Sequence, residues 1–123
     1  VLKTLSAVMQ RDVRTTDYFG RYGGDEFLLV LSETSLDGAC VYAERVRKEI
    51  EVLKWQAFQI DGAVTVSIGL TQYRPREEIA TTLARADKAL YLAKTQGRNR
   101  ISCDREVINI KTTPGSKARS ARP

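Results

Sequence analysis

The sequence contains no histidine, only two cysteines and no long apolar run. Without histidine, the usual zinc sites and every catalytic triad built on an imidazole are excluded. Cys40 and Cys103 are far apart in the chain and do not have metal-binding spacing. No stretch approaches the ~18 apolar residues of a membrane span, and the first residues, VLKTLSAVMQRD, lack the charged and apolar regions of a signal peptide. We therefore expect free cysteines and a cytoplasmic location.

The net charge of +5 belongs mostly to the C-terminal end of the chain. Residues 111–123 carry four basic side chains and no acidic one, which leaves +1 for residues 1–110. We expect one domain over residues 1–104 and a disordered basic tail over residues 105–123. A basic tail can contact nucleic acid or anionic lipid. The nearly neutral body argues against a nucleic-acid-binding module, so we expect no specific nucleic-acid partner.

The hydrophobic pattern alternates between helical and strand periods. Gly23-Gly24 predicts a tight hairpin turn, because glycine accepts the positive φ that such turns require. Ser35 and Thr34 are candidate N-caps, and Gly97 stands where a helix C-terminal cap is expected. The elements expected in order are a helix at 2–9, hairpin strands at 17–22 and 26–31, a helix at 36–53, a short strand in WQAFQI, a turn at Asp61-Gly62, a strand at 64–70, a helix at 76–95 and a strand at 100–103. This order predicts an α+β fold with helices packed on a mostly antiparallel sheet.

The segment RYGGDEF, residues 21–27, places two carboxylates directly after a glycine turn and before an apolar run. Carboxylate oxygens suit hard cations, and Mg²⁺ commonly joins one or two carboxylates to substrate phosphates. Gly23 and Gly24 let the backbone approach a phosphate with no Cβ in the way. Asp25 and Glu26 therefore indicate a metal–nucleotide site, and the alternative is an ordinary Gly-Gly turn with acidic flanks.

RYGGDEF resembles, letter for letter, the signature of GGDEF domains, which are diguanylate cyclases. The later segments TVSIGL and ADKALYLAKTQGRNR resemble the family's later strand and last helix, so the resemblance covers nearly everything from Val1 to Cys103. It implies a ferredoxin-like, nucleotidyl-cyclase-like sandwich. It also implies condensation of two GTP molecules to cyclic di-GMP (c-di-GMP), a magnesium or manganese cofactor and a catalytic homodimer.

The resemblance also implies roles for single residues. Asp25 matches a magnesium ligand that takes up the hydroxyl proton, and Glu26 matches the neighbouring functional acid. Lys94 and Arg98 match cations that contact phosphate, although cations near a helix C-terminus also interact favourably with the helix dipole. Leu2 matches an apolar residue against the guanine, although it also fits the core stripe of its helix.

A product-inhibition site is implied by Arg14-Thr-Thr-Asp17, which resembles the family's Arg-x-x-Asp motif just before the signature. Arginine offers a planar fork for phosphate or the guanine edge, and aspartate accepts from the guanine amino group. Arg45 matches an arginine that often joins this site. Without the resemblance, Arg14 is a surface cation and Arg45 a helix-surface residue paired with Glu49 at i+4.

The chain also departs from the family pattern. Family members begin upstream with a central strand that carries another magnesium-binding aspartate, followed by an asparagine and an aspartate that read guanine, and none of these has a counterpart here. We therefore expect this chain to be the C-terminal part of the domain and to be inactive alone. We also expect the missing strand to leave an apolar edge beside Phe27–Leu31.

The sequence leaves two functions open. The first is an active diguanylate cyclase with GTP as substrate, c-di-GMP as inhibitor and a sensory or regulatory domain upstream, where segments that anchor the full protein to a membrane can also lie. The second is a catalytically inactive c-di-GMP-binding module that uses only Arg14, Asp17 and Arg45. The intact Asp25-Glu26 pair favours the enzyme, because a receptor of that kind has no need of it.

Overall fold

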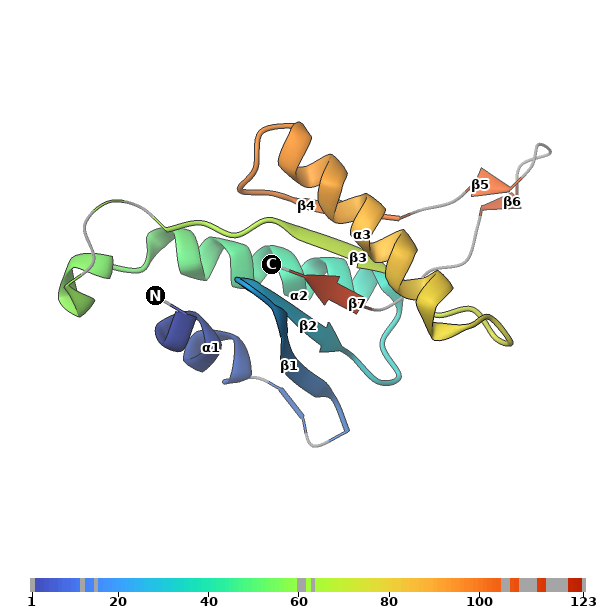
Figure 1. Ribbon diagram of the computed structural model, residues 1–123, viewed down its shortest axis with the longest axis horizontal. Helices are drawn as coiled ribbons and strands as arrows, with labels where there is room; N and C mark the ends of the chain where they lie inside the picture. Colours follow the sequence, from blue (N-terminus) through green and yellow to red (C-terminus); the bar gives the residue numbers. More distant parts are fainter. Residues whose placement is uncertain are drawn as a thin grey trace.

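The computed structural model describes residues 2–11, 13–14, 16–59, 62, 64–104, 107–108, 113–114 and 120–122. Figure 1 shows the elements, which in chain order are α1 (Leu2–Gln10), β1 (Tyr18–Gly23), β2 (Glu26–Val30), α2 (Leu36–Val52), the 3-10 helix η1 (Trp55–Phe58), β3 (Ile68–Thr71), α3 (Ile79–Thr95), β4 (Ile101–Cys103), β5 (Val107–Ile108), β6 (Thr113–Pro114) and β7 (Ser120–Arg122). Within these residues, none of the helices has the length and apolar character needed to cross a membrane.

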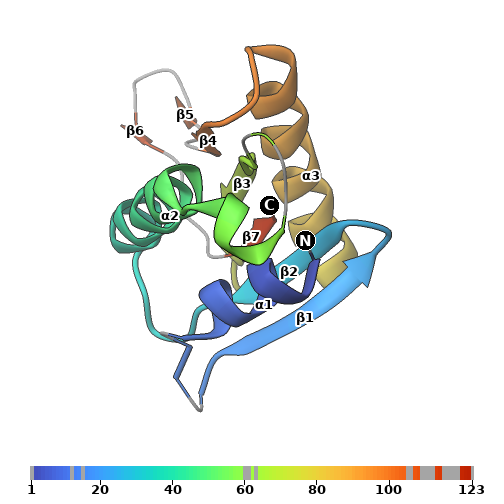
Figure 2. The ribbon, with the colours of Figure 1, turned by 90° about the vertical axis from the view of Figure 1, so that its left-hand side faces the viewer.

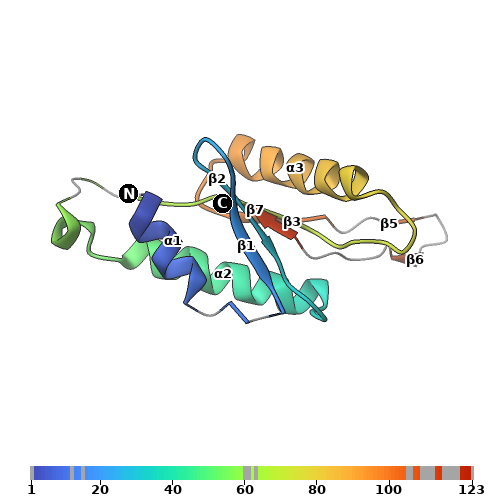
Figure 3. The ribbon, with the colours of Figure 1, turned by 60° about the horizontal axis from the view of Figure 1, so that its bottom comes forward.

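Five strands form the main sheet in the order β1-β2-β7-β3-β4, and β5 and β6 form a separate two-stranded sheet. β3 and β4 run parallel, whereas the other neighbouring strands of the main sheet are antiparallel. Helices cover both faces, with α2 and α3 on opposite sides of the sheet (Figures 2 and 3). The predicted α+β architecture with a mostly antiparallel sheet is confirmed.

The larger core lies between the sheet and the helices α1 and α2. Its buried residues come from α1, α2 and the strands, because these helices turn apolar side chains toward the sheet. The members with the lowest exposure include Leu29, Leu36, Ala39, Ile50, Ile68 and Leu70. On the opposite face α3 contributes small side chains, Ala86, Ala89 and Ala93, together with Leu90. These small residues let α3 lie close against β3.

Strand β7 occupies the middle of the sheet, between β2 and β3. It pairs Ala121 with Leu29 and Ser120 with Val30 on one side, and it pairs with Gly69 to Thr71 on the other. Residues 120–122 belong to the tail for which the sequence predicts disorder. They pair at the edge of β2 that the sequence predicts to be uncovered.

Three local predictions differ from the structure. The strand predicted at 64–70 begins only at Ile68 and ends at Thr71. The segment WQAF forms η1, not a strand, because Trp55 is buried and its indole N–H donates to the carbonyl of Ile50 at 3.0 Å. The third helix begins at Ile79, not near residue 76, since Arg76 has a left-handed φ of 71°. The predicted turn at Asp61 lies outside the described residues. The N-cap at Ser35 is confirmed by its 3.0 Å hydrogen bond from the N–H of Gly38.

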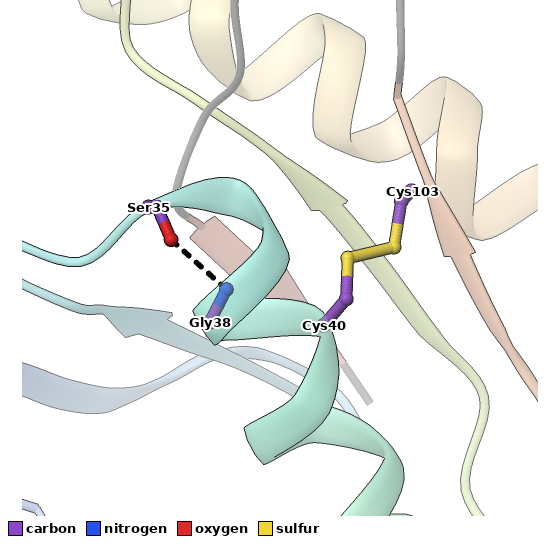
Figure 4. Close-up of a disulfide and its surroundings, with 4 residues drawn as sticks. All are labelled: Ser35, Gly38, Cys40 and Cys103. Atoms are coloured by element: carbon purple, nitrogen blue, oxygen red, sulfur yellow. Dashed lines mark hydrogen bonds between the residues drawn. A yellow bond between two sulfur atoms is a disulfide. The ribbon is translucent and has the colours of Figure 1, made fainter.

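The expectation of free cysteines was wrong, because Cys40 and Cys103 form a disulfide (Figure 4). Cys40 lies in the first turns of α2 and Cys103 lies at the end of β4, with 6.8 Å between their Cα atoms. The two residues are 63 positions apart. Their proximity results from the packing of α2 on β4, which the spacing in the sequence does not reveal.

Candidate active site at the turn between β1 and β2

The hairpin β1–β2 presents the two carboxylates at its turn. The strands pair Arg21 with Phe27 and Gly23 with Glu26, and the register shifts by one residue between these pairs. Gly24 then adopts a left-handed φ of 51°, which costs glycine little and other residues more. Asp25 is exposed and Glu26 is half-buried at the first position of β2, so the acids lie at the solvent-facing start of this strand.

The side chain of Arg21 crosses the turn. Its Nε and Nη2 atoms donate to the carbonyl oxygen of Gly24 at 2.8 and 2.6 Å. The turn is thus held by a side chain as well as by the ladder of the hairpin.

The two acids fit a magnesium site that is shared with a substrate. Among the described residues, no group of three or more histidine, cysteine, aspartate or glutamate side chains could hold a metal ion. A metal cage made only of protein ligands is therefore not present in this part of the chain. Mg²⁺ commonly keeps several waters and binds one or two carboxylates together with substrate phosphates, and Asp25 with Glu26 offers that donor set.

The predicted phosphate-contacting cations lie at the C-terminal end of α3. Lys94 is in the last turn and is half-buried, whereas Arg98 is exposed with a left-handed φ of 60°. Gly97 follows the helix with a φ of 128°, as predicted for a C-terminal cap. Within the described residues, no hydrogen bond or ion pair joins Lys94 or Arg98 to the acids of the turn. Leu2 begins α1, and its side chain lies outside what the structure describes.

The loop that carries Arg98 is tied to α2 through its neighbour Asn99. The Asn99 side chain accepts from Arg47 at 2.9 Å and donates to Glu51 at 2.6 Å. The hydrogen bond and charge of Glu44 outweigh the burial of Arg47 and raise its pKa above the ordinary value. Arg47 therefore stays charged, and the network fixes the backbone next to Arg98.

Arg14 and Asp17, the motif of the predicted inhibition site, contact each other. Arg14 Nε lies 3.3 Å from Asp17 Oδ2, and Arg14 Nη2 donates to the carbonyl of Ser32 and to Thr34 Oγ1. The Asp17 side chain is only 2% exposed. Burial alone would raise the pKa of Asp17, but hydrogen bonds from the backbone N–H groups of Ser32 and Arg14 and from the Arg14 side chain hold it below its ordinary value.

Arg45 lies on the outer face of α2 and forms the predicted pair with Glu49, at 4.0 Å. Glu49 also forms an ion pair with Arg11, and the guanidinium of Arg45 lies over the ring of Tyr42, 5.3 Å from its centroid. Thus Glu49 joins the end of α1 to the surface that carries Arg45. Within the described residues, no hydrogen bond or ion pair links Arg45 to Arg14 or Asp17.

Two open hollows of about 740 and 550 Å³ lie along α2 and between β2 and α3. Arg45 lines the first hollow, but Asp25 and Glu26 line neither. We place the candidate site at the acids because metal and phosphate chemistry depends on their charge and on the open glycine turn, and not on an apolar hollow.

Sequence reasoning missed three contacts at these positions: Arg21 on the Gly24 carbonyl, Asp17 on the N–H of Ser32, and Asn99 on Arg47. The first had a signal, because a long cation three residues before a glycine carbonyl can reach across a tight turn. The other two join residues that are distant in the sequence, and no local pattern reveals them.

Comparison with known proteins agrees with the motif. The family model described as "Diguanylate cyclase, GGDEF domain" matches residues 1–100. The chain is 39% identical over 102 residues to diguanylate cyclase DosC of Escherichia coli (strain K12), a match that covers 82% of this chain and 22% of DosC. The chain thus spans about a fifth of the length of that relative.

Solved structures agree as well. The GGDEF domain of DgcB from Caulobacter crescentus, in complex with c-di-GMP, superposes with a TM-score of 0.75 at 32% identity, covering 82% of this chain and 61% of that one. Diguanylate cyclase SiaD in complex with its activator SiaC, from Pseudomonas aeruginosa, gives a TM-score of 0.67 at 37% identity, covering 78% and 37% of the two chains. These matches confirm the expected nucleotidyl-cyclase-like fold, and the chain belongs to the GGDEF family of diguanylate cyclase domains.

Proposed function

We propose that this domain, within its complete protein, condenses two GTP molecules to c-di-GMP with Asp25 and Glu26 as its metal-binding and catalytic acids. The observation that carries the proposal is the exposed Asp25 at a glycine turn, directly before Glu26 and a strand whose Phe27 and Leu29 are buried. Membership of the GGDEF family supports the reaction class.

In this proposal the acids act on the attacking group. Asp25 takes up the proton of the 3′-hydroxyl of one GTP as that oxygen attacks the α-phosphate of the other, and pyrophosphate leaves. Magnesium, or manganese in its place, supplies positive charge that lowers the pKa of the hydroxyl and offsets the charge of the phosphate. Lys94 and Arg98 hold the phosphates, and Gly23 and Gly24 leave room for them at the backbone.

Each domain presents one GTP in this reaction, so a homodimer is the catalytic unit. The resemblance of Arg14, Asp17 and Arg45 to the family's inhibition motif supports feedback by c-di-GMP, and the DgcB domain was solved with c-di-GMP. SiaD was solved with its activator, which supports control by a partner or an upstream domain. We place the reaction in the cytoplasm because GTP is available there, and not because of the cysteines, which form a disulfide.

The proposal is tested with the complete protein, because the present chain spans only part of its relatives. The purified protein is incubated with GTP and Mg²⁺, and the products are separated by chromatography. We expect c-di-GMP and two molecules of pyrophosphate per c-di-GMP formed, and no product when the metal is chelated. A protein that binds c-di-GMP but forms none from GTP would show that the alternative, an inactive receptor domain, is correct.

A further inference from the structure

We propose that Arg21 is a positioning residue for the acidic turn, acting through the carbonyl oxygen of Gly24. Two N–H groups of one guanidinium, Nε and Nη2, donate to that single oxygen at 2.8 and 2.6 Å. Arg21 is otherwise exposed, and within the described residues both of its hydrogen bonds go to Gly24 and none to a carboxylate. Its role is therefore to hold backbone and not to neutralise the acids.

The register of the hairpin explains why this contact exists. From Tyr18 to Arg21 the pairing with β2 is regular, and the extra residue before Gly23 shifts it by one. A bulge of this kind bends its strand and redirects nearby side chains. The turn then contains only Gly24 and Asp25 between paired residues, so the guanidinium can reach the carbonyl three residues ahead.

The contacted carbonyl belongs to the peptide bond between Gly24 and Asp25. Since a peptide unit is planar, fixing its oxygen fixes the whole unit, including the N–H and the Cα of Asp25. The C=O and N–H of a trans peptide point in opposite directions, so the N–H of Asp25 points away from Arg21. Without this contact, only the hairpin pairing restrains Gly24, because glycine has no Cβ to restrict its φ.

The consequence for catalysis rests on the proposed function. A carboxylate that must meet both a cation and a hydroxyl tolerates little displacement, and a misplacement of about 1 Å can cost ~100-fold in rate. Arg21→Ala in the complete protein should therefore lower kcat about tenfold or more and change KM for GTP by less than about threefold. Arg21→Lys, which keeps the charge but not the fork, should recover only part of the loss.

Three controls separate loss of positioning from loss of charge and from loss of stability. Lys88→Ala removes an exposed positive charge from α3 and should leave kcat unchanged. The melting temperature of Arg21→Ala should match that of the wild-type protein, since the side chain is exposed. Full recovery of kcat by Arg21→Lys would show that charge alone is needed and would overturn the proposal, as would wild-type kcat in Arg21→Ala.

A second measurement does not depend on enzyme activity. In the complete protein without nucleotide, amide hydrogen exchange of Glu26, which pairs with Gly23 next to the turn, should accelerate about tenfold in Arg21→Ala and not in Lys88→Ala. An unchanged exchange rate in Arg21→Ala would overturn the positioning role of Arg21 even if the cyclase reaction were confirmed. Conversely, accelerated exchange in Arg21→Ala, together with no c-di-GMP formation by the wild-type protein, would support the positioning role of Arg21 and refute the proposed reaction.

Discussion

The carboxylate of Asp17 joins the two strands of the hairpin at the end opposite the acidic turn. Its Oδ1 accepts from the backbone N–H of Ser32 at 2.9 Å, and its Oδ2 accepts from the N–H of Arg14 at 3.1 Å. Both oxygens are therefore engaged inside the protein before any ligand is present. Asp17 is a structural acceptor in this state, whatever part it takes in binding a guanine.

Removal of this acceptor should destabilise the fold. In Asp17→Ala the N–H of Ser32 loses its partner, and an unsatisfied part-buried donor costs about 1–3 kcal/mol of unfolding free energy. Asp17→Asn retains an amide oxygen for Ser32 and should lose less. Urea unfolding of this chain at pH 7 measures both, and an Asp17→Ala protein as stable as the wild type would contradict the assignment.

The same residue predicts a dependence of stability on pH. The pKa of Asp17 is lowered in the folded protein, so the charged form stabilises the fold above the unfolded-state pKa of about 4. This contribution is lost as the pH falls from about 4 through the folded-state pKa. Between pH 5 and pH 3, unfolding free energy should therefore fall more steeply in the wild type than in Asp17→Asn. If unfolding free energy changed equally with pH in the two proteins, Asp17 would not contribute to the pH dependence of stability.

Arg14→Ala should relieve inhibition by c-di-GMP with little loss of initial rate. The Arg14 side chain is 59% exposed while Asp17 is buried, so Arg14 is the member of the motif that a ligand can reach. Arg14→Lys keeps the charge without the planar fork and should bind c-di-GMP with intermediate affinity. Titration of c-di-GMP into the complete proteins during turnover tests this. Equal inhibition of the wild type, Arg14→Ala and Arg14→Lys would show that Arg14 does not bind the inhibitor.

Much of the fold could be predicted because its signals are local. Each of these signals determines the structure within a few residues of its own position. They are the apolar run of β2, the glycines of the turn, Ser35 before α2 and Gly97 after α3. The disulfide, by contrast, joins residues 63 positions apart. Strand β7 pairs through its backbone, so the residue types at 120 and 121 do not predict the strand. The acids of the candidate site could be proposed from the sequence because their motif is contiguous.

Asp25→Asn in the complete protein should reduce c-di-GMP formation by about 100-fold or more while the fold is retained, because the amide loses the negative charge that binds the cation and takes up the proton. Asp25 is exposed, so its loss should not change the melting temperature. Glu78→Gln, at the exposed start of α3, is the control for loss of one negative charge. Substantial turnover by folded Asp25→Asn would refute the catalytic role.

Loss of the disulfide should destabilise this chain. A cross-link that closes a loop of about 63 residues stabilises the folded state by about 4 kcal/mol in the chain-entropy model. Cys103→Ser should therefore lower the urea midpoint, and dithiothreitol should lower the wild-type midpoint equally without affecting the variant. Because Cys40 and Cys103 are the only cysteines in the sequence, thiol titration of the denatured, unreduced chain should detect none. Two free thiols per chain would contradict the bond.

Gly69→Ala should destabilise the fold through a backbone contact between β3 and α3. A Cβ added at Gly69 would lie 2.2 Å from the backbone nitrogen of Leu90 and 2.6 Å from the carbonyl oxygen of Ala86. Backbone atoms cannot move aside as a flexible side chain does, so the strand and helix would have to separate. Overpacking of this kind costs about 1–3 kcal/mol or more.

At about 3–6 °C per kcal/mol, between the values for 60–100 and for 150–250 residues, the melting temperature of Gly69→Ala should fall by roughly 3–18 °C. Gly23→Ala is the matched control for stability, because a Cβ there would meet no atom within 4 Å and its φ is not in the left-handed region. Thermal unfolding of both variants of this chain, followed by circular dichroism, separates the effect of contact from that of losing a glycine. If Gly69→Ala melts within about 2 °C of Gly23→Ala, α3 does not lie in backbone contact with β3.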